Sequence, residues 1–585
     1  MASSLLGPPE LRLPTATATN PPMGFTENNS ATYLSSGNPC LDFFFHIVPD
    51  TPPQQVIARL SSAWDHHPLT TLKLVCNLRG VRGTGKSNKE GFYAAALWLH
   101  KHHPKTLACN VKAIADFGYF KDMLEILYRL LEGPQARMIE KTEWNNRKES
   151  VLDPKPGRKK RKLTEEKEKA RSLRLEKTVT KARKAFERYK RDPDYKFLHD
   201  RVSDFFAELL RSDMQYYNAN ELNKISLASK WCPTLDSSYD KATLMCESIV
   251  RKVFPREEHV EYQNIEEAHY AYRVRDRLRK EVLVPLHKAL QLPEVYISAN
   301  RWNELPYTRV ASVAMKLYKK LFYKHDHERF ESYLEKVRCG KSTIAAGAVL
   351  PHEIIRSLHD DNGPEVAELQ WKRMVDDVAK QGKLTNCMSI CDVSGSMSGI
   401  PMEVSVALGL LISELSEEPW KGKLITFSEK PRLHKIKGES LISKTEFIER
   451  MHWGESTNFQ RVFDRILEVA LKGKLGEDQM IKRLFVFSDM EFDQASQNDW
   501  ETDYKVIQKK FRRKGFQNVP EIVFWNLRDS LATPVPSDQK GVALVSGFSK
   551  NLVKLFLEGG GIVNPENVMQ QAISGEEYQK LVVFD

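Results

Sequence analysis

Residues Cys387–Gly399, with the sequence CMSICDVSGSMSG, join a short apolar run to a turn that is rich in hydroxyl and carboxyl groups. The run Cys387–Cys391 has the length and composition of a buried strand. Asp392, Ser394 and Ser396 follow at alternating positions, with glycines between and after them. These side chains offer oxygen ligands that suit a hard divalent cation, Mg²⁺ or Mn²⁺, and the glycines let the turn close around the ion.

The part of the chain around this stretch alternates between β-rich runs and amphipathic helices. The pattern predicts strands at Cys387–Cys391, Lys423–Phe427, Leu484–Phe487, Ile522–Trp525 and Val542–Val545. Such alternation indicates a mainly parallel sheet covered on both faces, in which ligands bind at the carboxyl ends of the strands. We therefore expect a Rossmann-like α/β domain over residues 381–585. Two later loops supply further candidate ligands, Thr457 in the loop 453–459 and Asp489 after the strand at 484–487.

This set of positions resembles the metal-ion-dependent adhesion site of von Willebrand factor A-type domains. The matching residues are Asp392, Ser394, Ser396, Thr457 and Asp489. The resemblance implies that the two serines, and often the threonine, coordinate the ion directly, while the aspartates act partly through bound water. It also implies a protein partner whose acidic side chain completes the coordination shell, and a binding module in place of an enzyme.

Residues 39–380 carry apolar side chains at three- and four-residue spacing, which predicts helices with short connections. A helical-repeat region followed by an A-type domain is the architecture of the Ro-type RNA-binding (TROVE) proteins. Over residues 40–585 the chain resembles a TROVE-like family of plant and fungal proteins of unassigned function, on the segments 224–233, 293–302, 305–315 and 345–354. The resemblance implies an all-α helical-repeat region that binds RNA or a ribonucleoprotein. Residues 1–38 are rich in Pro, Ser, Thr, Ala and Asn, and we expect them to be disordered.

The net charge of +11 is concentrated in one segment. Residues 155–191 hold 17 Lys or Arg against 5 Asp or Glu, a balance of +12, which leaves −1 for the rest of the chain. This segment lies in a charged insertion, residues 134–195, within the helical region. Its run 157–162 (GRKKRK) resembles a nuclear import signal. The same side chains could bind phosphates, or the insertion could simply be solvated; the candidates are Arg158, Lys159, Lys160, Arg161 and Lys162.

Residues 80–87 (GVRGTGKS) fit the P-loop pattern GxxxxGK[ST], in which backbone amides and the lysine hold phosphates. A working P-loop follows a buried strand, whereas the neighbouring segments here have a helical pattern, which favours a connection between two helices. Two alternatives stay open: a nucleotide site that would make the protein an enzyme, and phosphate contacts by Arg79, Arg82, Lys86 and Lys89.

Several classes of protein are disfavoured. No apolar run approaches the roughly 18 residues that cross a bilayer, and the chain does not begin with a secretory leader pattern. The eight cysteines form no CxxC pair, so a zinc ribbon is not expected. No catalytic triad or paired-carboxylate set can be assembled from motifs. We expect a non-enzymatic scaffold of the cytoplasm, the nucleus or both, which binds a protein through the metal site and RNA through its helices. A protein-assembly module without RNA is the alternative.

Overall fold

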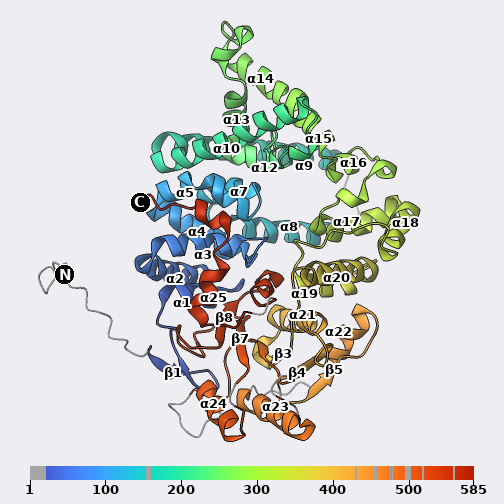
Figure 1. Cartoon of the computed structure of the whole chain (residues 1–585). Coiled ribbons are helices and arrows are strands. Elements are labelled where there is room, and N and C mark those ends of the chain that lie inside the picture. Colours follow the sequence, from blue (N-terminus) through green and yellow to red (C-terminus); the bar gives the residue numbers. More distant parts are fainter. Residues whose placement is uncertain are drawn as a thin grey trace, which may run out of the picture.

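The computed structural model describes residues 21–152, 160–427, 431–451, 458–474, 476, 479–493, 502–516, 519–557 and 560–585, with the backbone alone for 147–152 and 160–167. After a short N-terminal hairpin, helices dominate the chain from residue 39 to residue 379, and a six-stranded sheet with its own helices follows (Figure 1). This confirms the predicted succession of a helical region and an α/β region. Among the described residues, no helix is both long enough and apolar enough to span a bilayer.

The first helices form a tight stack at one edge of the molecule. They are α1 (Pro39–His46), α2 (Pro53–His66), α3 (Pro68–Arg79), α4 (Lys89–His102), α5 (Pro104–Cys109), α6 (Val111–Phe117) and α7 (Lys121–Glu132). Proline begins α1, α2, α3 and α5, at a position where a helix needs no backbone N–H donor. Gly133 ends α7 with a φ of +99°, a conformation that favours glycine.

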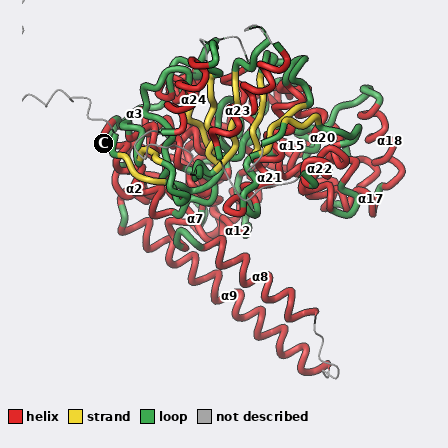
Figure 2. The backbone as a smooth tube through the Cα atoms, turned by 90° about the horizontal axis from the view of Figure 1, so that it is seen from below, coloured by secondary structure: helices red, strands yellow, loops and turns green. Residues whose placement is uncertain are grey.

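Two long helices, α8 (Ala136–Leu152) and α9 (Lys160–Arg191), make up the predicted charged insertion. Figure 2 shows them running antiparallel and projecting away from the rest of the molecule; we call these two helices the arm. At about 1.5 Å per residue, α9 alone is roughly 48 Å long. Near the base, Lys181 of α9 lies 3.7 Å from Glu140 of α8 and 3.4 Å from Glu132 of α7, so ion pairs fix the arm to the body.

The remaining helices follow the arm in two groups. The first comprises α10 (Pro193–Asn218), α11 (Ala228–Trp231), α12 (Ser238–Thr243), α13 (Met245–Val253), α14 (Glu267–Arg277), the π-helical turn η5 (Leu278–Leu283) and α15 (Val284–Ala289). The second comprises α16 (Pro293–Ser298), α17 (Ser312–His325), α18 (His327–Arg338), α19 (Pro351–Arg356) and α20 (Pro364–Ala379). Tyr307, Phe322 and Phe330 give the second group a small aromatic core of its own.

The sheet has the strand order β5-β4-β3-β6-β7-β8. Its strands are β3 (Cys387–Cys391), β4 (Lys423–Thr426), β5 (Leu433–Lys435), β6 (Arg483–Ser488), β7 (Glu521–Asn526) and β8 (Val542–Ser546). All neighbours are parallel except β5, an antiparallel edge strand that the sequence pattern did not predict. The other five strands lie where the sequence predicts them.

Helices cover both faces of this sheet, which explains why β3, β6 and β8 are buried at every position. Cys391 of β3 faces α21 (Ile400–Leu415), where Gly409 leaves room for its sulfur. On the opposite face, Phe524 of β7 packs on Phe459 of α23 (Phe459–Gly473), with ring centroids 5.4 Å apart. The other helices of this region are α22 (Leu441–Glu449), α24 (Asp503–Arg513) and α25 (Pro565–Ala572).

The N-terminal segment corrects one expectation. We predict disorder through residue 38, but β1 (Met23–Phe25) and β2 (Ala31–Tyr33) form an antiparallel hairpin. Tyr33 exchanges backbone hydrogen bonds of 3.0 and 2.9 Å with Thr533, beyond β7. The hairpin is ordered because its backbone groups form hydrogen bonds with a segment that lies 500 positions away in sequence. Residues 1–20 lie outside the described ranges.

The helical and α/β regions share one hydrophobic core. Helix α1 and helix α25 both pack against β8, at the edge of the sheet (Figure 1). The Ser546 hydroxyl at the end of β8 lies 3.0 Å from the carbonyl oxygen of Phe44 and 3.2 Å from that of Ile47. The chain changes from helices to strands between α20 and β3, but the hydrophobic core continues across this boundary.

Candidate functional site

The predicted metal ligands lie at the centre of the sheet. Strand β3 has β4, the next strand in the chain, on one side and β6 on the other, so the direction of strand addition reverses between β3 and β6. Crevices that bind ligands in doubly wound sheets form at the carboxyl ends of the strands at such a switch point. Cys391 pairs with Phe487, and Asp392 and Ser488 therefore follow at the same level of the sheet.

The turn after β3 brings three of the predicted residues together. Asp392 is fully buried, and its two carboxylate oxygens accept hydrogen bonds from the Ser394 amide at 2.9 Å and the Ser488 hydroxyl at 2.6 Å. A single 3-10 turn, η9 (Gly395–Met397), then folds back so that the Ser394 and Ser396 hydroxyls lie 2.9 Å apart. The two hydroxyls and the carboxylate thus occupy one corner of the sheet edge.

Asp489 follows β6 and adds a second carboxylate to this corner. It is 2% exposed, and its Oδ1 accepts a hydrogen bond of 3.1 Å from the Glu491 amide. Burial, and secondarily the negative charge of Asp489, raise the pKa of Asp392 to about 6. The structure therefore brings Asp392, Ser394, Ser396 and Asp489 to the same edge, as the sequence predicts.

The donor chemistry fits a hard divalent cation, because it consists of buried carboxylates and hydroxyls whose negative charge a cation would compensate. Within the described ranges there is no group of three or more His, Cys, Asp or Glu side chains placed to hold a metal ion. An ion at this edge would therefore depend on the serine hydroxyls as well as on the two carboxylates.

The fifth predicted ligand, Thr457, lies outside the described residues, and its role stays a prediction. The next residue, Asn458, caps α23 by accepting a hydrogen bond of 3.1 Å from the Arg461 amide. Phe459 is fully buried with its ring centroid 4.8 Å from that of Phe492, three residues after Asp489. Residues 458 and 459, at the end of the loop that contains Thr457, thus lie beside the loop that carries Asp489.

Sequence reasoning missed other residues at this edge. Ser488 orients Asp392 and also accepts a hydrogen bond of 3.1 Å from the Met490 amide. Arg528, two residues beyond β7, donates to the backbone carbonyl of Ser396. Glu491 accepts hydrogen bonds from the Ser530 hydroxyl at 2.6 Å and from the Glu27 amide of the N-terminal hairpin at 2.7 Å. Position directly after a predicted strand could have singled out Ser488, and position within three residues of one could have singled out Arg528.

The four basic residues around the P-loop-like segment do not form a phosphate-binding surface. Arg79 is 5% exposed and pairs with the Asp122 carboxylate at 2.7 Å. Lys86 is 1% exposed, and its amine donates to the carbonyls of Phe44 and Ile47 and to the Ser546 hydroxyl. Only Arg82 and Lys89 reach the surface. The loop packs against the α/β region, which buries Lys86 and leaves Arg82 and Lys89 exposed.

The glycines of this segment have a structural purpose. The segment connects α3 to α4, as the helical pattern predicts, and does not follow a strand. The loop doubles back so closely that a Cβ on Gly85 would lie 2.2 Å from the carbonyl oxygen of Gly80. Asn551 of the α/β region donates a hydrogen bond of 3.1 Å to the Gly85 carbonyl. These contacts account for the GxxxxGK spacing without a bound nucleotide.

Part of the second basic cluster lies in the arm. Arg158 and Lys159 lie outside the described residues, and Lys160, Arg161 and Lys162 occupy the first turn of α9. Residues 136–191 contain 21 Lys or Arg and 9 Asp or Glu, a balance of +12. This stretch of the sequence therefore accounts for the whole net charge of the protein.

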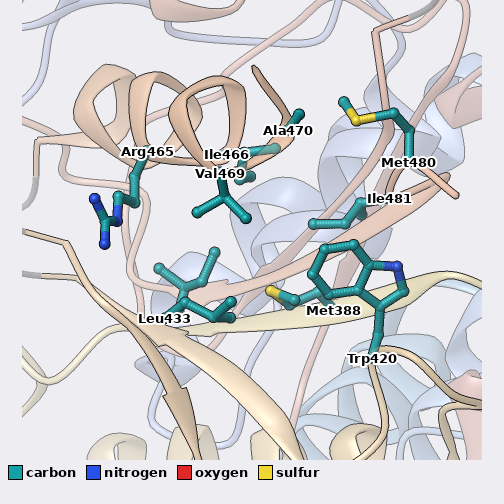
Figure 3. Close-up of a pocket in the computed structure, with 10 residues that line it drawn as sticks. Met388, Trp420, Leu433, Arg465, Ile466, Val469, Ala470, Met480 and Ile481 are labelled. Carbon is teal, nitrogen blue, oxygen red and sulfur yellow. The ribbon is translucent and has the colours of Figure 1, made fainter. Parts of the chain in front are cut away.

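A small apolar gap lies beneath the sheet, away from the strand ends (Figure 3). Its volume of about 10 Å³ leaves room for about one water molecule. The residues that line it are Met388, Trp420, Ile425, Leu433, Arg465, Ile466, Val469, Ala470, Met480 and Ile481. We interpret it as a packing gap between the sheet and α23.

Comparisons with known proteins give two family matches that divide the chain where its helices give way to strands. One family, described as a domain of unknown function (DUF2828), matches residues 26–384, and a second, also of unknown function (DUF7788), matches residues 386–582. Uncharacterized protein L728 of Acanthamoeba polyphaga mimivirus is 27% identical over 556 residues, which cover 92% of this chain and 84% of the viral protein.

These matches overturn the family resemblance inferred from the motifs. Neither a TROVE nor a von Willebrand A-type family supports it, so that identification is wrong. A few polar residues after parallel strands are an insufficient basis for a family, because sheet edges of this kind recur in unrelated proteins.

Proposed function

The chain belongs to the DUF2828 family, and we propose that it is a binding protein that holds a protein partner through a divalent cation at the carboxyl ends of β3 and β6. One observation carries this proposal: Asp392, Ser394, Ser396 and Asp489 meet at the switch point of the sheet. The serine hydroxyls and the two carboxylates would hold Mg²⁺ or Mn²⁺. The ion would supply an open coordination position for an acidic side chain of the partner.

Thermal melting with Mg²⁺ and with EDTA tests the cation site. A ligand that binds only the folded state stabilises it by about 2.7 kcal/mol at a hundred times its dissociation constant. We expect Mg²⁺ to raise the melting temperature of the wild type, and the double substitution Ser394→Ala with Ser396→Ala to abolish that increase. Ser398→Ala is the matched control, because Ser398 is an exposed serine of the same loop outside the predicted ligand set.

Two results would contradict the metal site. One is a wild-type melting temperature that does not respond to Mg²⁺ or Mn²⁺ at any concentration tested. The other is an equal loss of the response in Ser398→Ala, which would point to a general effect of the loop. A partner captured from a lysate in Mg²⁺ and released by EDTA would extend the result from the ion to the protein partner.

A second candidate function is RNA binding by the arm, and its charge favours it. Residues 136–191, which include both helices of the projecting arm, have a balance of +12 and attract polyanions before any other part of the chain does. Each phosphate that the arm neutralises adds about 0.7 to the magnitude of the slope of log affinity against log salt on single strands, and about 0.9 on duplex B-DNA. Filter binding at several salt concentrations measures this slope. A slope near zero would favour a protein-assembly module without RNA.

The run 157–162 also supports a location in the nucleus, the cytoplasm or both. A reporter fused to the wild-type chain or to a chain with Arg158, Lys159 and Lys160 changed to alanine tests this. Nuclear accumulation that is lost in the variant would identify an import signal, and identical distributions would show that the run does not direct import.

A further inference from the structure

A large cavity lies outside the candidate metal site, among the helices near the base of the arm. Its volume is about 670 Å³, within the range of small-molecule sites. The loop before α12 and helix α13 form one wall, and the continuous helix α14–η5–α15 forms the other. The lining residues are Thr234, Leu235, Asp236, Cys246, Tyr272, Arg275, Asp276, Leu278, Arg279, Leu283, Val284 and His287.

A π-helical turn shapes the second wall. The turn Leu278–Leu283 interrupts an otherwise α-helical element from residue 267 to 289. Turns of this kind are rare and are frequently found at functional sites, because the extra residue redirects the side chains that follow it. Tyr272, Arg275 and Arg279 precede or enter the turn at three- and four-residue spacing, so one face of the helix presents an aromatic ring and two guanidinium groups.

The cavity combines an apolar floor with exposed apolar side chains at its rim. Leu278 and Leu283 are buried beneath it. Leu235, Tyr272 and Val284 at the rim are 48%, 69% and 53% exposed. Exposed apolar side chains gathered around one cavity favour a ligand with a flat or apolar part of its own.

The charged groups of the cavity differ in their ion pairs. Asp276 pairs with Lys280 at 2.8 Å, and Arg275 lies 3.9 Å from Glu247 while its Nε donates to the Ala271 carbonyl. Among the residues that the structure describes, Arg279 forms no ion pair. Arg279 is exposed one helical turn from Arg275, so an anion at the rim could contact both.

We propose that this cavity binds a nucleoside phosphate, either free or as one unit of a single-stranded RNA. Arg279, assisted by Arg275, holds the phosphate, since guanidinium groups match its oxygens. Tyr272 stacks on the base, and Asp236 accepts a hydrogen bond from a base or ribose donor. Helix α12 follows the cavity loop and packs on α9, which brings RNA held by the arm within reach of the cavity. The RNA form rests on the second candidate function, whereas the free nucleotide does not.

Isothermal titration of the full chain with AMP and with a five-nucleotide oligoadenylate tests this site. We expect Tyr272→Ala to weaken binding by about 5- to 150-fold, the range for loss of one stacked base. We expect Arg279→Glu to weaken it by at least 10-fold. Arg273→Glu is the matched control, because Arg273 is exposed on the same helix but does not line the cavity. Tyr272 and Arg279 are exposed, and unchanged melting temperatures would show that their variants fold.

The outcomes separate the two sources and the two proposals. Binding of AMP that both cavity variants weaken supports a free nucleotide, and binding of the oligonucleotide alone supports RNA. No binding of either probe at millimolar concentration, or an equal loss in Arg273→Glu, would overturn the site. A longer RNA that binds the wild type and both cavity variants equally would overturn the RNA form of the site, while leaving the arm as the RNA-binding element.

Discussion

Substitution of the buried Lys86 tests how the helical and α/β regions are joined. Its amine donates to the carbonyls of Phe44 and, at 3.4 Å, Ile47, and to the Ser546 hydroxyl at 2.7 Å. It also lies 4.4 Å from the centroid of the Phe44 ring. Burial lowers the pKa of Lys86 well below its usual value. The side chain thus links the α3–α4 connection, which carries it, to the C-terminal end of α1 and to the end of β8 through buried hydrogen bonds.

The expected cost of Lys86→Ala follows from these contacts. Three buried methylene groups contribute about 0.8 kcal/mol each, or roughly 2.4 kcal/mol. Ser546 has one hydroxyl proton for two carbonyls, so one backbone acceptor is left unpaired at a cost of about 1–3 kcal/mol. Removal of the amine also removes the free-energy cost of burying it, which offsets part of these two losses. We therefore expect the free energy of unfolding to fall by about 3–4 kcal/mol. Lys86→Met keeps the stem and should cost about 1 kcal/mol.

Urea unfolding followed by circular dichroism and by tryptophan fluorescence measures both variants, with ATP and GTP added in parallel to the wild type. We expect neither nucleotide to be held through Lys86, since the amine is 1% exposed. The reasoning would be refuted if Lys86→Ala were as stable as the wild type and lost a nucleotide-dependent stabilisation. That result would restore the P-loop interpretation of residues 80–87.

Two further predictions concern Lys550 and Gly85. Burial lowers the pKa of Lys550 to about 8, against roughly 10.4 in an unfolded chain. Below pH 8 the folded state is destabilised by a buried ammonium group. As the pH rises from 8 to roughly 10.4, the folded state loses this proton before the unfolded state does, and the destabilisation disappears. The stability of the wild type relative to Lys550→Met should therefore rise, by on the order of 3 kcal/mol, between pH 7.5 and pH 10.5; a difference independent of pH in urea titrations would contradict this. Gly85→Ala should lower the urea midpoint strongly because of its contact with Gly80, while Gly347→Ala, where a Cβ meets nothing within 4 Å, should change it little. Equal midpoints for the two variants would show that the loop can relax.

The sequence was most informative where local pattern and chemistry coincide. The apolar run Cys387–Cys391 and the polar turn after it predict both a central strand and the residues at its end, and parallel pairing with β6 then brings Asp489 to them. These inferences need only strand order and the rule that strand ends share an edge.

Features that depend on distant partners could not be predicted. The N-terminal hairpin has a composition typical of disorder and is ordered by Thr533. Lys86 fits a phosphate-binding pattern, and only its neighbours Phe44 and Ser546 show that it is buried. The π-helical turn Leu278–Leu283 has no sequence signature of its own, because helical periodicity continues on both sides of it.

The contact between α1 and β8 has a consequence for biosynthesis. The Phe44 carbonyl and the Ser546 hydroxyl are 502 positions apart. At about 5–20 residues per second, a ribosome completes that interval in roughly 25–100 s. During this time the nascent chain holds Phe43, Phe44 and Phe45, which are all buried in the finished molecule, without β8, one of the elements against which α1 packs. We expect the growing polypeptide to need chaperone protection over this interval, and prematurely terminated chains to aggregate.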